Sequence, residues 1–281
     1  MPLQLFEDAM GDQRNARFLA VAADLAYYSQ AEGESKFRDE LGLAGHLASV
    51  DNTQAWIAAN EDHIVVAFRG TEKPTAIEGL KDWLLTNAMN LLVVPEGRLG
   101  TDLAAAGVGA RFHQGFVEAI AEIWPAVLSA VEGELAKADR PVWVTGHSLG
   151  GALALFAAWL LTRKMINVHQ VYTFGAPMIG NQVAIDAFNR EFKGKLFRYT
   201  NQPDPVPRLP MYSLLANEFV HCEEERQLDT GAGNPTDSLV KNMAKDAVDK
   251  VLSVSLVDNI WNSVVGGIAA HGMDNYRKLL G

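Results

Sequence analysis

A serine stands between two glycines in the pattern Gly146-x-Ser148-x-Gly150, after an apolar run over residues 142–145 and before a helix-like run over residues 152–161. The order strand, sharp turn, helix lifts a serine hydroxyl clear of a sheet, where a base can reach it. Such a turn is crowded, so glycines two positions before and after the serine fit it. Ser148 is therefore the candidate nucleophile, and the alternative is that it only caps the following helix.

A serine nucleophile needs a histidine base, and in hydrolases of this architecture the order along the chain is serine, acid, histidine. Of the 7 histidines, only His221 and His271 follow the last run that could carry the acid. His221 lies in residues 218–223, a pattern typical of a strand interior. His271 lies in a break between a helical pattern over residues 238–268 and a final turn over residues 276–280, where a loop would present it. We expect His271 to be the base, with His221 as the alternative.

The acid that orients the histidine must be held rigidly. Asp204 directly follows an apolar run over residues 196–200 and stands between Pro203 and Pro205. Proline fixes φ and reduces the freedom of the unfolded loop, so the carboxylate is held in one place. Asp204 is thus the favoured acid. Asp186 and Asp229 are the alternatives, and Asp204 could also be an ordinary turn aspartate.

The oxyanion of an ester transition state needs two hydrogen-bond donors. One should be the backbone N–H of Leu149, which follows the nucleophile, and the other should come from the loop after an earlier strand. The apolar run over residues 63–68 leads into Gly70 and Thr71, which suit that role because glycine allows close approach and threonine offers both N–H and hydroxyl.

The elements that must position these residues alternate along the chain. Helical spacing of apolar residues predicts helices over residues 15–29, 115–137, 149–163 and 181–192. Short apolar runs predict strands over residues 55–59, 63–68, 141–145, 171–174 and 196–200, the first two joined by a tight turn. Strands separated by helices imply an α/β fold: a mostly parallel central sheet with helices on both faces, and function at the carboxyl ends of the strands.

The composition narrows the class of protein. The chain has 281 residues, 48% hydrophobic and 21% charged, with 24 Lys+Arg against 34 Asp+Glu. We expect one domain over residues 1–281, because no repeat or linker divides the sequence. The net charge of −10 argues against nucleic-acid binding, and no apolar run is long enough to span a membrane. With only Cys222, no internal disulfide or cysteine-based zinc site is possible, and no metal or cofactor is expected.

Several motifs, taken in order, resemble those of the class 3 lipases, the fungal triacylglycerol lipase type. They are Phe68-Arg69-Gly70-Thr71, Asp82-Trp83-Leu84, His113-Gln114-Gly115-Phe116, residues 146–151, Phe174-Gly175-Ala176-Pro177 with Gly180-Asn181, residues 204–210, and His271 with Tyr276. The resemblance implies the α/β-hydrolase fold, a triad of Ser148, Asp204 and His271, and an oxyanion hole of Thr71 and Leu149. Ala270 departs from the family, which usually has an acidic residue before the histidine, and Thr71 replaces the serine of several fungal members.

The resemblance also implies an amphipathic lid, here at about residues 72–86. Ile77, Leu80, Trp83 and Leu84 share one helical face, which could cover the site in water and turn onto a lipid surface. The alternative is that Trp83 and Leu84 belong to the fixed core.

Together these features predict a serine hydrolase that cleaves carboxylic esters of lipids, a triacylglycerol lipase or carboxylesterase, acting at a lipid–water interface. The alternatives are a phospholipase A1 or a feruloyl-type esterase with the same triad, and a non-catalytic lipid-binding relative. The sequence as it stands shows no signal peptide, so we expect a cytoplasmic protein, or a secreted one if a leader was removed or export is leaderless. The oligomeric state is not predicted.

Overall fold

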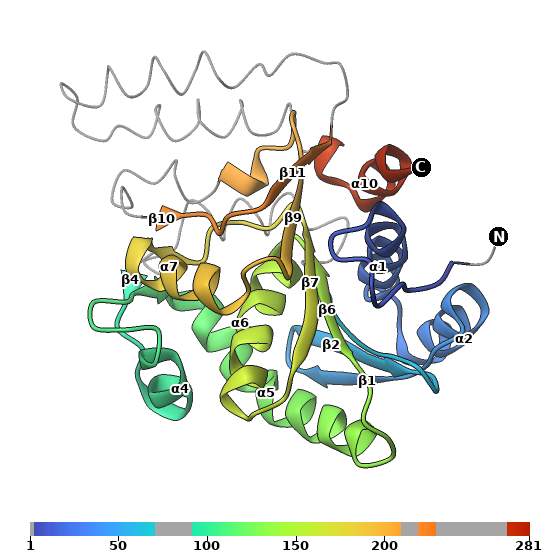
Figure 1. The fold of residues 1–281 in the computed structure, drawn as a ribbon, viewed down its shortest axis with the longest axis horizontal. Helices are drawn as coiled ribbons and strands as arrows, with labels where there is room; N and C mark the ends of the chain where they lie inside the picture. Colours follow the sequence, from blue (N-terminus) through green and yellow to red (C-terminus); the bar gives the residue numbers. More distant parts are fainter. Residues whose placement is uncertain (1–2, 71–91, 209–218, 229–268) are drawn as a thin grey trace.

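The computed structural model describes residues 3–70, 92–208, 219–228 and 269–281, and within these ranges the largest sheet has seven strands in the order β1-β2-β3-β6-β7-β9-β11 (Figure 1). The strands are β1 (Ala44–Val50), β2 (Thr53–Ala59), β3 (Ile64–Phe68), β6 (Val142–His147), β7 (Val168–Phe174), β9 (Leu196–Asn201) and β11 (Glu225–Leu228). The strands from β3 to β11 run parallel, while β1 and β2 are antiparallel to their neighbours. The predicted mostly parallel sheet is confirmed.

Helices cover both faces of this sheet (Figure 1). One face carries α1 (Gln13–Leu25), α2 (Gln30–Leu41) and α10 (Met273–Leu280), and the other carries α5 (Gln114–Leu135), α6 (Leu149–Arg163) and α7 (Gln182–Glu191). Successive residues of a strand point to opposite faces, so Val66 and Phe68 of β3 pack into one core cluster and Val65 and Ala67 into the other. Burial on both sides explains why these strands are continuous apolar runs rather than alternating ones.

A second, small sheet lies beside the first and has the order β10-β8-β5-β4. Its strands are β4 (Leu92–Val93), β5 (Phe112–His113), β8 (Gly180–Asn181) and β10 (Phe219–Val220), all paired antiparallel. Shorter helical segments complete the described elements: η1 (Gly97–Leu99), α4 (Gly100–Ala104) and η2 (Val206–Arg208).

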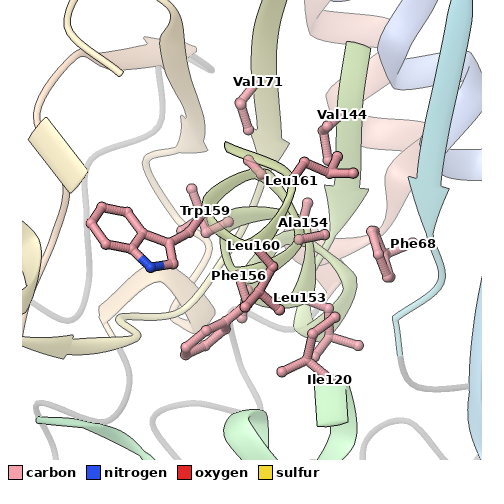
Figure 2. Packing of buried hydrophobic residues seen from close by; sticks show 14 of the residues in the cluster. Phe68, Ile120, Val144, Leu153, Ala154, Phe156, Trp159, Leu160, Leu161 and Val171 are labelled. Carbon is pink, nitrogen blue, oxygen red and sulfur yellow. The ribbon is translucent and has the colours of Figure 1, made fainter. Parts of the chain in front are cut away.

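The helix that follows the candidate nucleophile is packed on all sides. Residues 150–161 of α6 are all buried, and a helix that is apolar all round belongs in a core. Figure 2 shows α6 between Val144 and Val171 of the sheet and Ile120 of α5. Full burial of each leucine or phenylalanine side chain contributes roughly 1.5–3 kcal/mol to the stability of the fold. The start of α6, directly after Ser148, is therefore fixed by the core behind it.

The helix α10 is fastened to α1, which lies beside it in Figure 1. The carbonyl of Leu280 accepts hydrogen bonds from Gln13 Nε2 (3.0 Å) and from Arg17 Nε (2.5 Å). Arg277 forms an ion pair with Asp24 at 2.6 Å. These contacts fix the place of the residues just before α10, which include His271.

Most predicted elements are present, with corrections at three places. The sequence did not predict α2 or β1. The strand expected over residues 218–223 is only β10, and His221 follows it rather than lying inside a strand. The expected final turn over residues 276–280 is the helix α10, which begins at Met273. The predicted helix over residues 238–268 lies outside the described residues.

Candidate active site

Ser148 occupies a sharp turn between β6 and α6. Its backbone has φ 57° and ψ −130°, a region that residues with a Cβ seldom adopt, and holding it there costs about 1–3 kcal/mol. The turn is tied to the sheet because the Ser148 N–H donates to the carbonyl of Phe174 at 2.9 Å. Such strain is kept only where the surroundings enforce it, and it presents the side chain at the carboxyl end of β6.

The glycines around Ser148 are required by close backbone approaches, as predicted. A Cβ on Gly146 would overlap the carbonyl of Gly150, and a Cβ on Gly150 would overlap the carbonyl of Phe68 at the end of β3. On the other side of the turn, a Cβ on Gly70 would lie 3.1 Å from the Ser148 Cβ. The end of β3 therefore lies directly against the candidate nucleophile.

The structure brings together the acid and the histidine that the sequence singles out. His271 Nδ1 and Asp204 Oδ2 are 2.7 Å apart, with Asp204 at 2% and His271 at 9% exposure. The other carboxylate oxygen, Oδ1, accepts the Val206 N–H at 2.9 Å in the proline-rich loop after β9. A carboxylate has only acceptor sites when ionised, so His271 Nδ1 carries the proton and Nε2 is left with its lone pair. This is the tautomer that a general base requires.

The Nε2 atom of His271 is buried and has no hydrogen-bond partner among the described residues. It therefore makes no hydrogen bond to the Ser148 hydroxyl in this state. Catalytic hydrogen bonds of this type are often long without substrate and tighten when it binds. A buried nitrogen without a partner is costly in a core, and its presence indicates a site kept ready for another group.

Tyr276 is a site residue that the sequence did not single out for a role. Its hydroxyl donates to Asp204 Oδ2 at 2.6 Å and accepts the Asn201 N–H at 3.2 Å. Burial, reinforced by the Asp204 charge, raises the pKa of Tyr276 well above its usual range, so the hydroxyl stays protonated and donating. The side chain of Asn201 also donates to the carbonyl of Ala270 at 2.9 Å, which ties the end of β9 to the loop that carries His271.

Gly175 lies against the acid–histidine pair. It has φ +60°, and a Cβ there would lie 2.9 Å from Asp204 Oδ2 and 3.0 Å from His271 Nδ1. The glycine therefore serves both needs, a left-handed backbone and space for the two side chains. In the sequence it appears only as part of a motif, Phe174-Gly175-Ala176-Pro177.

Other candidates fall in three groups. Leu149 is the first residue of α6, so its N–H is among the four that no helical carbonyl accepts. Asp186 is exposed on α7 and bonds Gln182, and His221 Nε2 bonds the carbonyl of Pro207, so neither joins the site. The remaining ones lie outside the described residues: Thr71, Asp229, and the lid at about residues 72–86 with Ile77, Leu80, Trp83 and Leu84.

In the part of the chain that the structure describes, no cluster of three or more His, Cys, Asp or Glu side chains could hold a metal ion. None of the helices in that part has the length and apolar character needed to cross a membrane.

The chain is similar to known proteins in sequence and in fold. The family described as Lipase (class 3) matches residues 65–214, just over half of the chain. The secreted mono- and diacylglycerol lipase 1 of Fusarium solani is 38% identical over 138 residues, which are 48% of this chain and 38% of that protein. A chloroplastic phospholipase A(1) of Arabidopsis thaliana is 27% identical over 175 residues, 59% of this chain and 38% of that protein. The aligned part of the chain thus spans less than half the length of either relative.

A solved triacylglycerol lipase, described as having a serine protease triad at its catalytic centre, aligns with a TM-score of 0.60. The alignment covers 79% of this chain and 83% of that one at 21% identity, and this likeness shows the shared fold. The resemblance expected from the sequence motifs is confirmed. The chain has the α/β-hydrolase fold and belongs to the class 3 lipase family.

Proposed function

We propose that this protein is a serine hydrolase that cleaves carboxylic esters of lipids through an acyl-enzyme on Ser148. The observation that carries the proposal is the buried Asp204–His271 pair, 2.7 Å apart, with its Nε2 unpaired. The His271 ring lies 4.5 Å from the ring of His147, the residue just before the strained turn at Ser148. A capping serine would need neither a positive φ nor a histidine held in one tautomer. The family match and the lipid hydrolases among the relatives support the same conclusion.

In the proposed reaction the Ser148 hydroxyl attacks the ester carbonyl and His271 Nε2 takes its proton. The ring becomes an imidazolium that the Asp204 carboxylate stabilises, and the proton is then passed to the departing alcohol. Water then attacks the carbonyl of the acyl-enzyme while His271 Nε2 takes the water proton. That proton passes to the Ser148 oxygen as the carboxylic acid leaves. The oxyanion would be bound by the N–H of Leu149, aided by the positive end of α6, and by Thr71. Each such donor typically contributes about 3–4 kcal/mol to transition-state stabilisation.

The substrate class is proposed from the relatives. The Fusarium relative is named for mono- and diacylglycerols and the Arabidopsis relative for phospholipids, so we propose acyl esters of glycerolipids. Triacylglycerol, phospholipid, feruloyl and short soluble esters remain as arms of the test. The Fusarium relative is named as a secreted lipase, and this favours the secreted alternative over a cytoplasmic location for the present protein. The single domain over residues 1–281 and the lid at about residues 72–86 stay predictions.

The test is Ser148→Ala with Ser35→Ala as the matched control, since Ser35 is exposed on α2. We expect Ser148→Ala to lower kcat by about 10⁴-fold or more while the thermal unfolding midpoint stays close to wild type. Rates would be measured on diacylglycerol, triacylglycerol, phosphatidylcholine, a feruloyl ester and a short soluble nitrophenyl ester. A serine-directed phosphonate should label wild type and Ser35→Ala but not Ser148→Ala. Equal turnover in Ser148→Ala would reject the nucleophile, and no turnover or labelling in wild type would favour the non-catalytic lipid-binding alternative.

A further inference from the structure

His147, the residue just before the nucleophile, is built into a chain of hydrogen bonds. It is the last residue of β6 and is 4% exposed. Its Nδ1 lies 2.8 Å from the Tyr27 hydroxyl, and its Nε2 lies 2.7 Å from the backbone carbonyl of His271. Both ring nitrogens therefore have partners, one at the end of α1 and the other on the candidate base itself.

The direction of these bonds follows from the chemistry of the partners. A carbonyl oxygen only accepts, so His147 Nε2 must carry the proton that it donates to His271. In a neutral ring Nδ1 is then an acceptor, and Tyr27 must donate to it. Burial and the nearby Asp24 charge raise the pKa of Tyr27, and the smaller opposing effect comes from a hydrogen bond of the Gly70 backbone. The Tyr27 hydroxyl thus keeps its proton and links the end of β3 to His147.

The two imidazole rings also lie close together. The ring centroids of His147 and His271 are 4.5 Å apart, with an angle of 32° between the planes. A second positive charge at that distance would oppose formation of the His271 imidazolium during turnover. A neutral His147 with its proton on Nε2 can hold the His271 backbone without adding that charge.

We propose that His147 and Tyr27 are positioning residues. Tyr27 donates to Nδ1 and so reinforces the tautomer that the His271 carbonyl selects. His147 in turn holds the main chain of His271 so that the Nε2 atom of His271 faces the Ser148 hydroxyl during catalysis. The inference rests on the proposed function, in which His271 is the base. It also connects the base to Gly70, the described residue just before the expected oxyanion residue Thr71.

The first test compares Tyr27→Phe with Tyr28→Phe. Tyr28 is the neighbouring tyrosine, and its ring lies 4.6 Å from the Lys36 ammonium rather than at the site. Loss of the hydroxyl donor should lower kcat of Tyr27→Phe on a soluble ester by about tenfold, with KM unchanged. Tyr28→Phe should match wild type. A change in KM alone, or equal kcat for Tyr27→Phe and wild type, would overturn the inference.

The second test separates the two ends of the His147 ring. His147→Gln can keep a donor near the Nε2 position, whereas His147→Asn keeps only a group near Nδ1. We expect His147→Gln to retain about tenfold more kcat than His147→Asn. In the His147→Gln background, adding Tyr27→Phe should not lower kcat further, because glutamine has no ring tautomer that Tyr27 could stabilise. Equal rates for the two variants at equal unfolding midpoints, or fully additive losses, would contradict a positioning role.

The third test does not depend on turnover. In protein carrying isotope-labelled histidine, the ring nitrogen shifts of His147, identified by their loss in His147→Gln, should report a proton on Nε2. In Tyr27→Phe the signal should move toward the other tautomer. An Nδ1 proton in wild type, or no change in the variant, would overturn the inference even if the enzyme is active. An inactive wild type with the expected shifts would reject the proposed function while leaving the tautomer assignment standing.

Discussion

Tyr276 donates its hydroxyl to the same oxygen of Asp204 that pairs with His271, at 2.6 Å and 2.7 Å respectively. With two donors on one oxygen, the carboxylate is held in a single orientation toward the imidazole. The acid is therefore held from both sides, by Val206 on Oδ1 and by Tyr276 on Oδ2. Its rigidity comes from hydrogen bonds as well as from the neighbouring prolines.

Tyr276→Phe removes this second donor and keeps the ring in place. A hydrogen bond to a charged group contributes about 1.5–3 kcal/mol, so we expect the free energy of unfolding to fall by about that amount. We also expect kcat to fall by about tenfold, because Asp204 is less firmly oriented. Denaturant unfolding and ester turnover measure the two effects. Tyr28→Phe is the control, and a stability loss with unchanged kcat would show that Tyr276 is only structural.

Asp204→Asn tests the orienting role of the carboxylate. An asparagine of the same shape can hold the imidazole in the wrong tautomer, and in a related triad this change costs about 10⁴-fold in kcat. We expect a loss of that order with KM little changed. Asp186→Asn, on the exposed face of α7, should behave as wild type. Near-normal activity in Asp204→Asn would redirect the search for the acid to Asp229.

Gly175→Ala tests the close packing of the acid–histidine pair. Its added methyl group would lie about 3 Å from both side chains and push them apart, so we expect kcat to fall at least about tenfold. Gly42→Ala is the matched control, since Gly42 has φ +66° with nothing within 4 Å of the added methyl group. Both variants should lose about 1–2 kcal/mol of stability from the left-handed backbone. Equal activity in the two variants would refute the steric argument.

The buried His113 should make stability depend on pH. Burial lowers the pKa of His113 to about 3, whereas an unfolded chain takes up this proton near its ordinary value of 6.5. Between these values the unfolded state binds more protons, so the free energy of unfolding falls as pH falls from 6.5 toward 3, by up to about 1.4 kcal/mol per pH unit. His113 stabilises the fold fully only above this window.

His113→Asn removes the titrating group and keeps an acceptor for the Phe116 N–H at the start of α5. Denaturant unfolding at several pH values should therefore give a slope in this window that is smaller by about 1.4 kcal/mol per pH unit. His46→Asn, at an exposed position on β1, should leave the slope unchanged. A His113→Asn slope equal to that of wild type would contradict the assignment.

The sequence predicts the helices and strands whose burial pattern can be recognised from the order of residues alone. Buried strands such as β3 and β6 are continuous apolar runs, and α6 has the predicted bounds of residues 149–163. The helix α5 continues through Pro125. The missed elements, α2 and β1, bury few residues, so their residues carry little periodic signal. Strand order could not be predicted either, because paired residues of β9 and β11, such as Arg198 and Glu225, are 27 positions apart (225 − 198) with no local signal.

The residues of the candidate site also fall into two groups, those that the sequence could identify and those that it could not. The candidates Ser148, Asp204 and His271 could be proposed because each follows a recognisable pattern in the sequence, in a fixed order along the chain. The supporting residues Tyr27, His147 and Tyr276 form contacts between distant parts of the chain, and Tyr27 and His147 are 120 positions apart. His147 precedes the candidate nucleophile Ser148, and that adjacency was the available signal. Tyr27 had no comparable mark, since tyrosine at a helix end is common.

The attachment of α10 to α1 makes the C-terminal helix a requirement for the candidate site. A polypeptide that has organised everything from α1 to β11 already contains the serine turn and the acid loop, yet on the proposed mechanism it has nothing to accept the hydroxyl proton. On that mechanism the base is in place only when α10 is docked on α1 through Leu280 and Arg277. We therefore expect loss of this docking to abolish ester hydrolysis even where the rest of the fold is intact.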